Sequence, residues 1–170
     1  MNIQTAVQKQ LEFWHGIIDG TVADCPSDTL HRLIPGSTIG SIASTYAHAV
    51  LGEDIVVHAM FQGKPPIFEA QGWAAKTGVS NPGPMQNLDW AKTVKLNVPA
   101  FQEYAKTVYA ATNAFLAGLT EADLQRKVPG PVGEQPLEES LVVLLATHYM
   151  AHGGEITALK GAQGLKGLPF

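Results

Sequence analysis

The chain has 170 residues, of which 45% are hydrophobic, and this length and composition fit one folded domain over residues 1–170. Its net charge is −4 and its Lys and Arg residues are scattered, which argues against a nucleic-acid partner and against a polybasic membrane contact. Cys25 is the single cysteine, so no intrachain disulfide can form, as expected in a reducing cytoplasm. Residues 1–20 show no signal-peptide pattern, and no apolar run of about 18 residues predicts a membrane-spanning helix.

Apolar residues at helical spacing predict a first helix over residues 3–20. The residues that mark it are Ile3, Val7, Leu11, Trp14 and Ile18. Residues 21–37 contain several turn formers, and a short turn over Ser27–Leu33 is expected, with Ser27 as its N-cap.

A second helix should begin near Ser37 or Thr38 and run to about Gln62, because proline and glycine follow it. Residues 63–88 then form a long connection, which is unusual in a compact bundle and therefore often functional. An additional turn is expected around Asp89–Lys95.

A third helix is predicted over residues 98–118, with Asn97 as its cap and Pro99 in the first turn, where a missing N–H costs nothing. Thr120–Asp123 resembles a capping box and opens another short turn. Pro129, Pro131 and Pro136 then suggest a stiff connector.

The last helix should run from about Leu137 to Lys160 and stop at Gly161. No stretch of the chain shows a convincing strand pattern or an internal repeat. Four long helices joined by long crossover connections predict an all-α four-helix bundle.

His148 and His152 lie four residues apart in the last predicted helix, so their side chains point the same way and can share one metal ion. A histidine pair at this spacing can also be exposed or hydrogen-bonded. Here Leu141, Leu145 and Leu159 lie on the same face of the helix as the histidine pair, so this face is expected to be buried. A buried polar pair needs a hydrogen-bond partner or a metal ion.

The third ligand is expected from the second helix, where His48 is surrounded on the wheel by mostly small residues that leave space. A lone helical histidine is normally satisfied by a neighbour, so His48 is convincing only together with the pair. Three neutral imidazoles suit zinc, nickel or another borderline ion and leave at least one position open for chemistry.

Two other metal sites are less consistent with the sequence. A metalloprotease helix needs Glu directly after its first histidine, where this chain has Tyr149. A di-iron bundle needs two Glu-x-x-His units, and Glu12-x-x-His15 is the one found on the predicted bundle helices.

Glu155 lies near both histidines on the wheel and is a candidate catalytic base, fourth ligand or orienting group, with a solvated carboxylate as the alternative. His15 and His58 are weaker candidates. Tyr46 and Trp73 could line a pocket but are more often packing residues.

The chain resembles the DinB-like proteins, a superfamily that includes thiol-dependent maleylpyruvate isomerases. The segments that carry the resemblance, in chain order, are Gly36-Ser37-Thr38-Ile39-Gly40-Ser41 leading to His48, Gln71-Gly72-Trp73, His148-x-x-x-His152-x-Gly-Glu, and Lys160–Phe170. The resemblance implies a four-helix bundle with a long crossover, a metal site at His48, His148 and His152, and a homodimer.

Family members with known activity are often metal-dependent transferases or isomerases that use a low-molecular-weight thiol. The resemblance therefore implies an enzyme that acts on a small-molecule substrate. A non-catalytic metal-binding or stress-associated protein, in which the ion stabilises the bundle, and a small-molecule binder are the alternatives. The common family run after the second histidine is Arg-Gly-Gln, whereas this chain has Gly153-Gly154-Glu155, so substrate contacts near Glu155 should differ.

Overall fold

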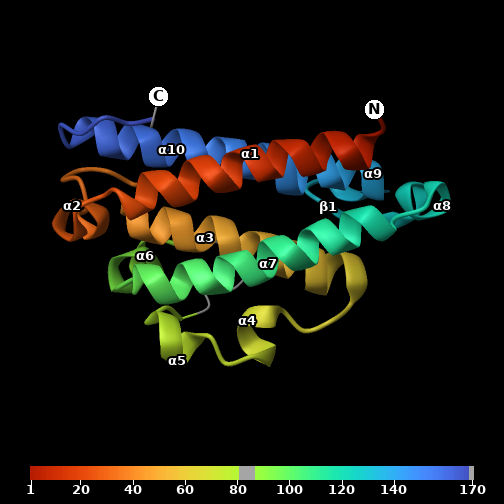
Figure 1. Cartoon of the computed structure of the whole chain (residues 1–170), viewed down its shortest axis with the longest axis horizontal. Helices are drawn as coiled ribbons and strands as arrows, with labels where there is room; N and C mark the ends of the chain where they lie inside the picture. The colour runs from red at the N-terminus through yellow and green to blue at the C-terminus, as the bar shows by residue number, and fades with distance from the viewer. Residues whose placement is uncertain (81–86, 169–170) are drawn as a thin grey trace.

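A computed structural model describes residues 1–80 and 87–168, which form a four-helix bundle (Figure 1) and confirm the predicted all-α class. Its long helices are α1 (Ile3–Ala23), α3 (Ile42–Asp54), α7 (Val98–Gly118) and α10 (His148–Ala162). Wider π-helical turns extend two of them: η1 (Ile55–Met60) continues α3, while α9 (Leu137–Ser140) and η2 (Leu141–Thr147) lead into α10.

Contacts between the helices show their directions. Tyr46 packs on Phe101 and Asp54 bonds to Tyr104, so α3 and α7 run parallel. Asp19 accepts a bond from Tyr46 while His15 pairs with Glu53 further along α3, so α1 is antiparallel to α3. A parallel α3 and α7 require the chain to return along the bundle, which explains the long connection.

This connection carries three short helices, α4 (Ile67–Ala70), α5 (Ala74–Thr77) and α6 (Leu88–Thr93). Residues 81–86 of the predicted 63–88 connection lie outside the described residues, as do Pro169 and Phe170. Phe68 and Trp73 are buried and pack on Tyr104 of α7, so apolar contacts hold the first part of the connection against the bundle.

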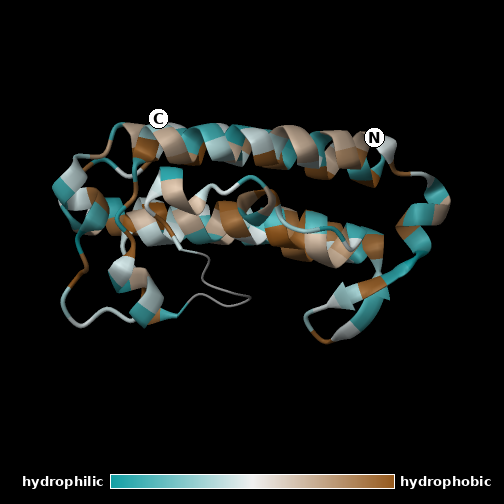
Figure 2. Ribbon diagram, turned by 90° about the horizontal axis from the view of Figure 1, so that it is seen from below, coloured by the Kyte–Doolittle hydropathy of each residue, from teal (hydrophilic) through white to brown (hydrophobic). Residues whose placement is uncertain are grey.

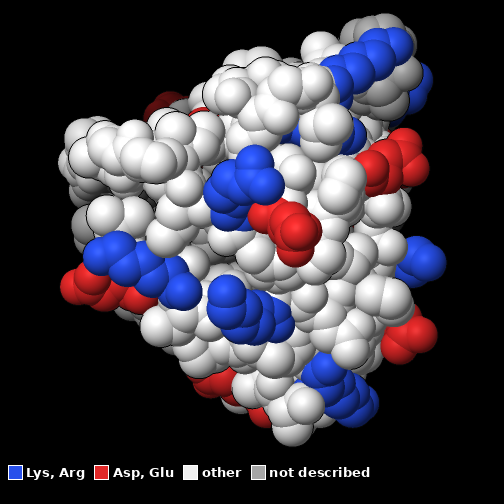
Figure 3. Space-filling view, turned by 90° about the vertical axis from the view of Figure 1, so that its left-hand side faces the viewer, with Lys and Arg blue, Asp and Glu red and all other residues white. Residues whose placement is uncertain are grey.

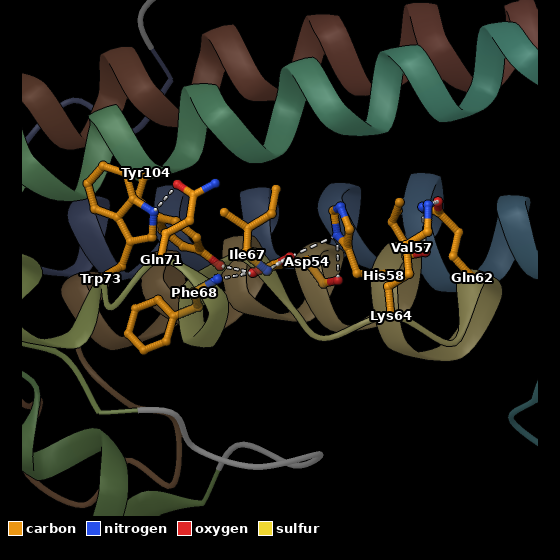
Figure 4. A network of polar contacts seen from close by, with 10 residues as sticks. All are labelled: Asp54, Val57, His58, Gln62, Lys64, Ile67, Phe68, Gln71, Trp73 and Tyr104. Atoms are coloured by element: carbon orange, nitrogen blue, oxygen red, sulfur yellow. Dashed lines mark hydrogen bonds and ion pairs between the residues drawn. The ribbon is translucent and has the colours of Figure 1, made fainter.

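The connection is anchored by the buried carboxylate of Asp54 at the end of α3 (Figure 4). Its Oδ1 accepts a bond from the backbone N–H of Ile67 at 2.9 Å and lies 2.9 Å from Nδ1 of His58. Its Oδ2 accepts from the N–H of Phe68 and from the hydroxyl of Tyr104, both at 2.8 Å. One side chain thus satisfies the free amides at the start of α4 and joins three elements.

Replacing Asp54 with Ala should lower the free energy of unfolding by about 3–5 kcal/mol, because four donors would lose a buried charged acceptor. Guanidinium unfolding followed by circular dichroism measures the effect. Asp89→Ala is the matched control, since Asp89 is exposed and pairs with Lys92 on the surface; its unfolding midpoint should not move. Equal midpoints for the two variants would contradict the anchoring role.

Several predicted helix boundaries are confirmed. The third helix spans Val98–Gly118 as predicted, and the Asn97 side chain accepts a bond from the N–H of Ala100. Thr120 and Asp123 form the capping box of α8 (Glu121–Gln125). The first helix extends three residues beyond its predicted end.

Other boundaries were wrong. The second helix begins at Ile42 with Ser41 as its cap, because Ser37 instead bonds to the backbone of Ile39 in a local turn. In α2 (Ser27–His31), Ser27 is the first helical residue, and the predicted Ser27 cap is not formed. Gly161 does not stop the last helix, which continues to Ala162.

The expectation that no segment forms a strand was also wrong. The predicted proline connector is a hairpin of β1 (Lys127–Gly130) and β2 (Gly133–Pro136), with Lys127 opposite Pro136. These strands are short and contain prolines, so they lack the apolar alternation that reveals a strand. The hairpin projects at the end of the bundle where the N-terminus lies (Figure 2).

The described surface shows no concentration of one charge at the end of the bundle seen in Figure 3. There, acidic and basic side chains are interspersed with wide uncharged areas. Among the described helices, none is both long enough and apolar enough to pass through a membrane.

Candidate metal centre

The structure brings the three predicted histidines together between α3 and α10. Nε2 of His148 lies 3.4 Å from Nε2 of His48 and 3.1 Å from Nε2 of His152. Among the described residues, these three form the one group of potential ligands that could hold a metal ion, with ligand atoms all within 4.8 Å of one another. Metal binding itself stays a prediction.

A glycine in α3 makes room for this arrangement. A Cβ atom at Gly52 would lie 2.8 Å from Cε1 of the His148 ring, closer than a side-chain carbon can approach. Gly52 follows His48 by one helical turn, so its missing side chain lets the imidazole from α10 settle against α3. Gly52 is one of the small residues that the sequence places around His48, but the sequence could not show that the space it leaves is filled by the His148 ring.

Burial keeps two of the imidazoles neutral. Removal from water and, to a smaller extent, the neighbouring His152 together lower the pKa of His48 to about 4. Burial likewise lowers the pKa of His148 to about 3, with smaller contributions from His152 and His48. At neutral pH both rings therefore have a free nitrogen lone pair, which is the form that binds metals.

Glu155 sets the tautomer of His152. The Glu155 carboxylate lies 2.7 Å from Nδ1 of His152, so Nδ1–H donates to it. The lone pair of neutral His152 then sits on Nε2, the atom that faces His148. Carboxylate–histidine pairs of this kind orient the histidine ligands of metal sites.

The geometry fits a divalent ion. Zinc–nitrogen bonds of about 2.0–2.1 Å at a tetrahedral angle separate two ligand nitrogens by about 3.3 Å. The separations of 3.4 and 3.1 Å from Nε2 of His148 lie on either side of this value, and all three ligand atoms lie within 4.8 Å of one another. Three ring nitrogens lie close to one point, and two of the rings resist protonation. A metal cation, rather than a proton, is therefore the partner that suits their lone pairs best.

Replacing Gly52 with Ala should weaken zinc binding about 10–100-fold, because the new Cβ atom would displace the His148 ring. This is the range found when a residue that orients a metal ligand is lost. Competition with a chromophoric chelator measures the affinity. Gly16→Ala is the matched control in α1, since a Cβ there meets nothing within 4 Å. Unchanged affinity in Gly52→Ala would show that the His148 position is not critical.

The remaining candidates have structural surroundings. His15 is a buried core histidine and His58 bonds to Asp54, so neither joins the cluster. Cys25 is buried and burial raises its thiol pKa, which argues against an activated thiol. Tyr46 is fully buried and bonds to Asp19, while Trp73 packs on Tyr104, so both act in packing.

A buried polar network lies behind the histidines in the bundle core. Nε2 of His15 is 2.9 Å from Glu53, and the His15 ring stacks on Tyr109 at 3.5 Å between centroids. Tyr109 and Tyr46 both donate to Asp19, whose pKa is raised by burial and partly lowered by these bonds. Sequence reasoning missed Glu53 and Asp19, although Glu53 shares a helix face with Tyr46 and Val50.

Comparisons with known proteins agree with this fold. Residues 12–156, which include all three histidines, match the family model of the DinB superfamily. The structure is also similar to the crystal structure of a conserved protein from Enterococcus faecalis, with a TM-score of 0.81 and 17% sequence identity over 96% of this chain and 99% of that one. At this identity the likeness concerns the fold alone. None of the curated proteins matches the chain.

Proposed function

The chain belongs to the DinB superfamily, and we propose that it is a metal-dependent enzyme that activates a low-molecular-weight thiol or water. The observation that carries this proposal is the convergence of His48, His148 and His152 on one point between α3 and α10. Zinc or nickel is the proposed ion, because three neutral imidazoles suit borderline metals.

The side chains have distinct roles in this proposal. His48, His148 and His152 would hold the ion, and three protein ligands leave at least one position for a substrate atom. A bound divalent cation lowers the pKa of a coordinated thiol or water, so that the deprotonated nucleophile forms near neutral pH. Glu155 keeps Nδ1 of His152 protonated through their 2.7 Å contact and has a second oxygen that could accept a proton.

Replacing His148 with Ala should remove both metal binding and thiol consumption while the protein stays folded. Elemental analysis gives the metal per chain, and the reaction of a thiol panel with 1-chloro-2,4-dinitrobenzene gives the turnover by absorbance. His58→Ala is the matched control, because His58 is also a helical, partly buried histidine but lies outside the cluster. Full metal content and turnover in His148→Ala would refute the ligand assignment.

The position of the cluster also favours a second candidate function. In this alternative the protein is not catalytic, and the ion stabilises the bundle. His48 and His148 lie 100 residues apart in sequence and on different helices, so an ion between them would cross-link α3 and α10. This alternative gains support if chelation lowers the melting temperature by many degrees and no thiol is consumed with metal present. Turnover with metal present would exclude it.

Two substitutions of Glu155 should separate its roles. Glu155→Gln keeps an oxygen that can accept from His152 and should leave zinc affinity within a few-fold, whereas Glu155→Ala should weaken it about 10–100-fold. If Glu155 is also a base, Glu155→Gln loses turnover at nearly full metal occupancy. Equal affinities for all three proteins would mean that Glu155 does not orient His152.

We also propose a cytoplasmic homodimer that acts on a small molecule, with neither nucleic acid nor membrane as a partner. The exposed apolar side chains of Phe13, Val143 and Met150 support the homodimer, because a second copy of the chain could cover them. A buried, unpaired Cys25 is consistent with a reducing compartment.

A further inference from the structure

Two adjoining hollows lie on the surface beside Glu155. The smaller, of about 150 Å³, lies between the loop before α3 and helix α6, and its lining includes Thr38, Gly40 and Leu88. The larger, of about 410 Å³, follows α10 toward its C-terminal end. Ile39 and Glu155 line both, so we treat the two hollows as one groove.

The larger part of this groove has an apolar lining. Besides Glu155, its lining residues are Ile34, Ile39, Gly154, Ala158, Leu159 and Ala162. Small residues on α10 leave the space open, and a Cβ atom at Gly154 would meet nothing within 4 Å. The hollow is open to solvent on one side and has room for a small alkyl or aryl group rather than for a whole enclosed ligand.

Charge in the groove is restricted to the point where the two hollows meet. Glu155 is the single ionisable residue among the described residues that line the two hollows, and no Lys, Arg or His is among them. A carboxylate bound here would find no cation to balance it and would face Glu155 instead. The lining therefore selects against anions and for an uncharged apolar group.

The groove adjoins the candidate metal centre through Glu155. Glu155, at the point where the two hollows meet, lies 2.7 Å from Nδ1 of His152. Gly52 abuts His148, whereas Ile39, which precedes α3, shares a hollow with Ala158, so α3 and α10 are antiparallel. The groove therefore begins at Glu155, about one turn beyond the histidines. A molecule held at the metal could extend along α10 into it.

We propose that this groove binds the alkyl or aryl part of a neutral organic substrate whose reacting atom lies at the three histidines. The proposal rests on the proposed function, because it assigns the substrate class of the same site. It excludes dicarboxylates such as maleylpyruvate, the substrate expected from the isomerases that the sequence resembles.

Alkanethiols test the proposal on the cobalt-loaded protein, where thiolate coordination produces a charge-transfer absorption band. The affinity should rise from ethanethiol to hexane-1-thiol by about fourfold for each methylene that enters the groove. The anionic 6-sulfanylhexanoate should lose most of this gain. Ala158→Leu fills the groove with a good helix former and should abolish the dependence on chain length.

Ala114→Leu is the matched control, because Ala114 is exposed on α7 and lines neither hollow. It should keep the wild-type dependence. An equal rise in Ala158→Leu and wild type, or no rise in wild type despite a clear cobalt–thiolate band, would overturn the groove assignment and leave the metal site intact.

A metal-independent probe separates this result from failure of the proposed function. The neutral fluorophore prodan should bind wild type and Ala114→Leu, with a blue-shifted emission, and should bind Ala158→Leu at least tenfold more weakly. If no thiol coordinates the cobalt, thiol activation is refuted while prodan still reports on the groove. Equal prodan binding by all three proteins would refute the groove.

Discussion

The close approach of α3 and α10 at Gly52 is the constraint on which the candidate metal centre depends. His148 lies where a side chain on α3 would otherwise be, and this brings its Nε2 to 3.4 Å from that of His48. Because the two helices are antiparallel, the turn that follows His152 reaches the loop before α3. The same packing therefore produces both the histidine cluster and the apolar groove beyond Glu155.

Two consecutive carboxylates position α3 within the bundle. Glu53 pairs with His15 of α1, while Asp54 bonds to Tyr104 of α7 and to the start of α4. Both carboxylates are fully buried, where a charge without partners is costly. We interpret them as groups that specify one rotation and register of α3, since sliding or turning the helix would separate both from their partners. That rotation directs Gly52 and His48 toward α10.

The sequence predicted what depends on short-range spacing. The four-residue interval between His148 and His152, the capping box at Thr120 and the limits of α7 are all local patterns. It could not predict the π-helical turns of η1 and η2, which have no residue signature, nor the pairing of Glu53 with His15, 38 positions apart. The hairpin was missed because prolines hide its strands. His48 was found only by combining it with the histidine pair of the last helix, because a lone helical histidine carries no such signal.

The chain departs from the common family run beside the groove, at the turn that follows His152. Where the resemblance expects Arg-Gly-Gln, this chain has Gly153-Gly154-Glu155. A Cβ atom at Gly153 would lie 2.7 Å from the Trp14 ring, so an arginine cannot occupy this position while Trp14 packs there. Position 153 therefore has no side chain, and Glu155 carries an anion where the family run has the neutral Gln. The proposal of a neutral substrate rests on this carboxylate beside an apolar lining, because an anion there would meet a like charge and no balancing cation.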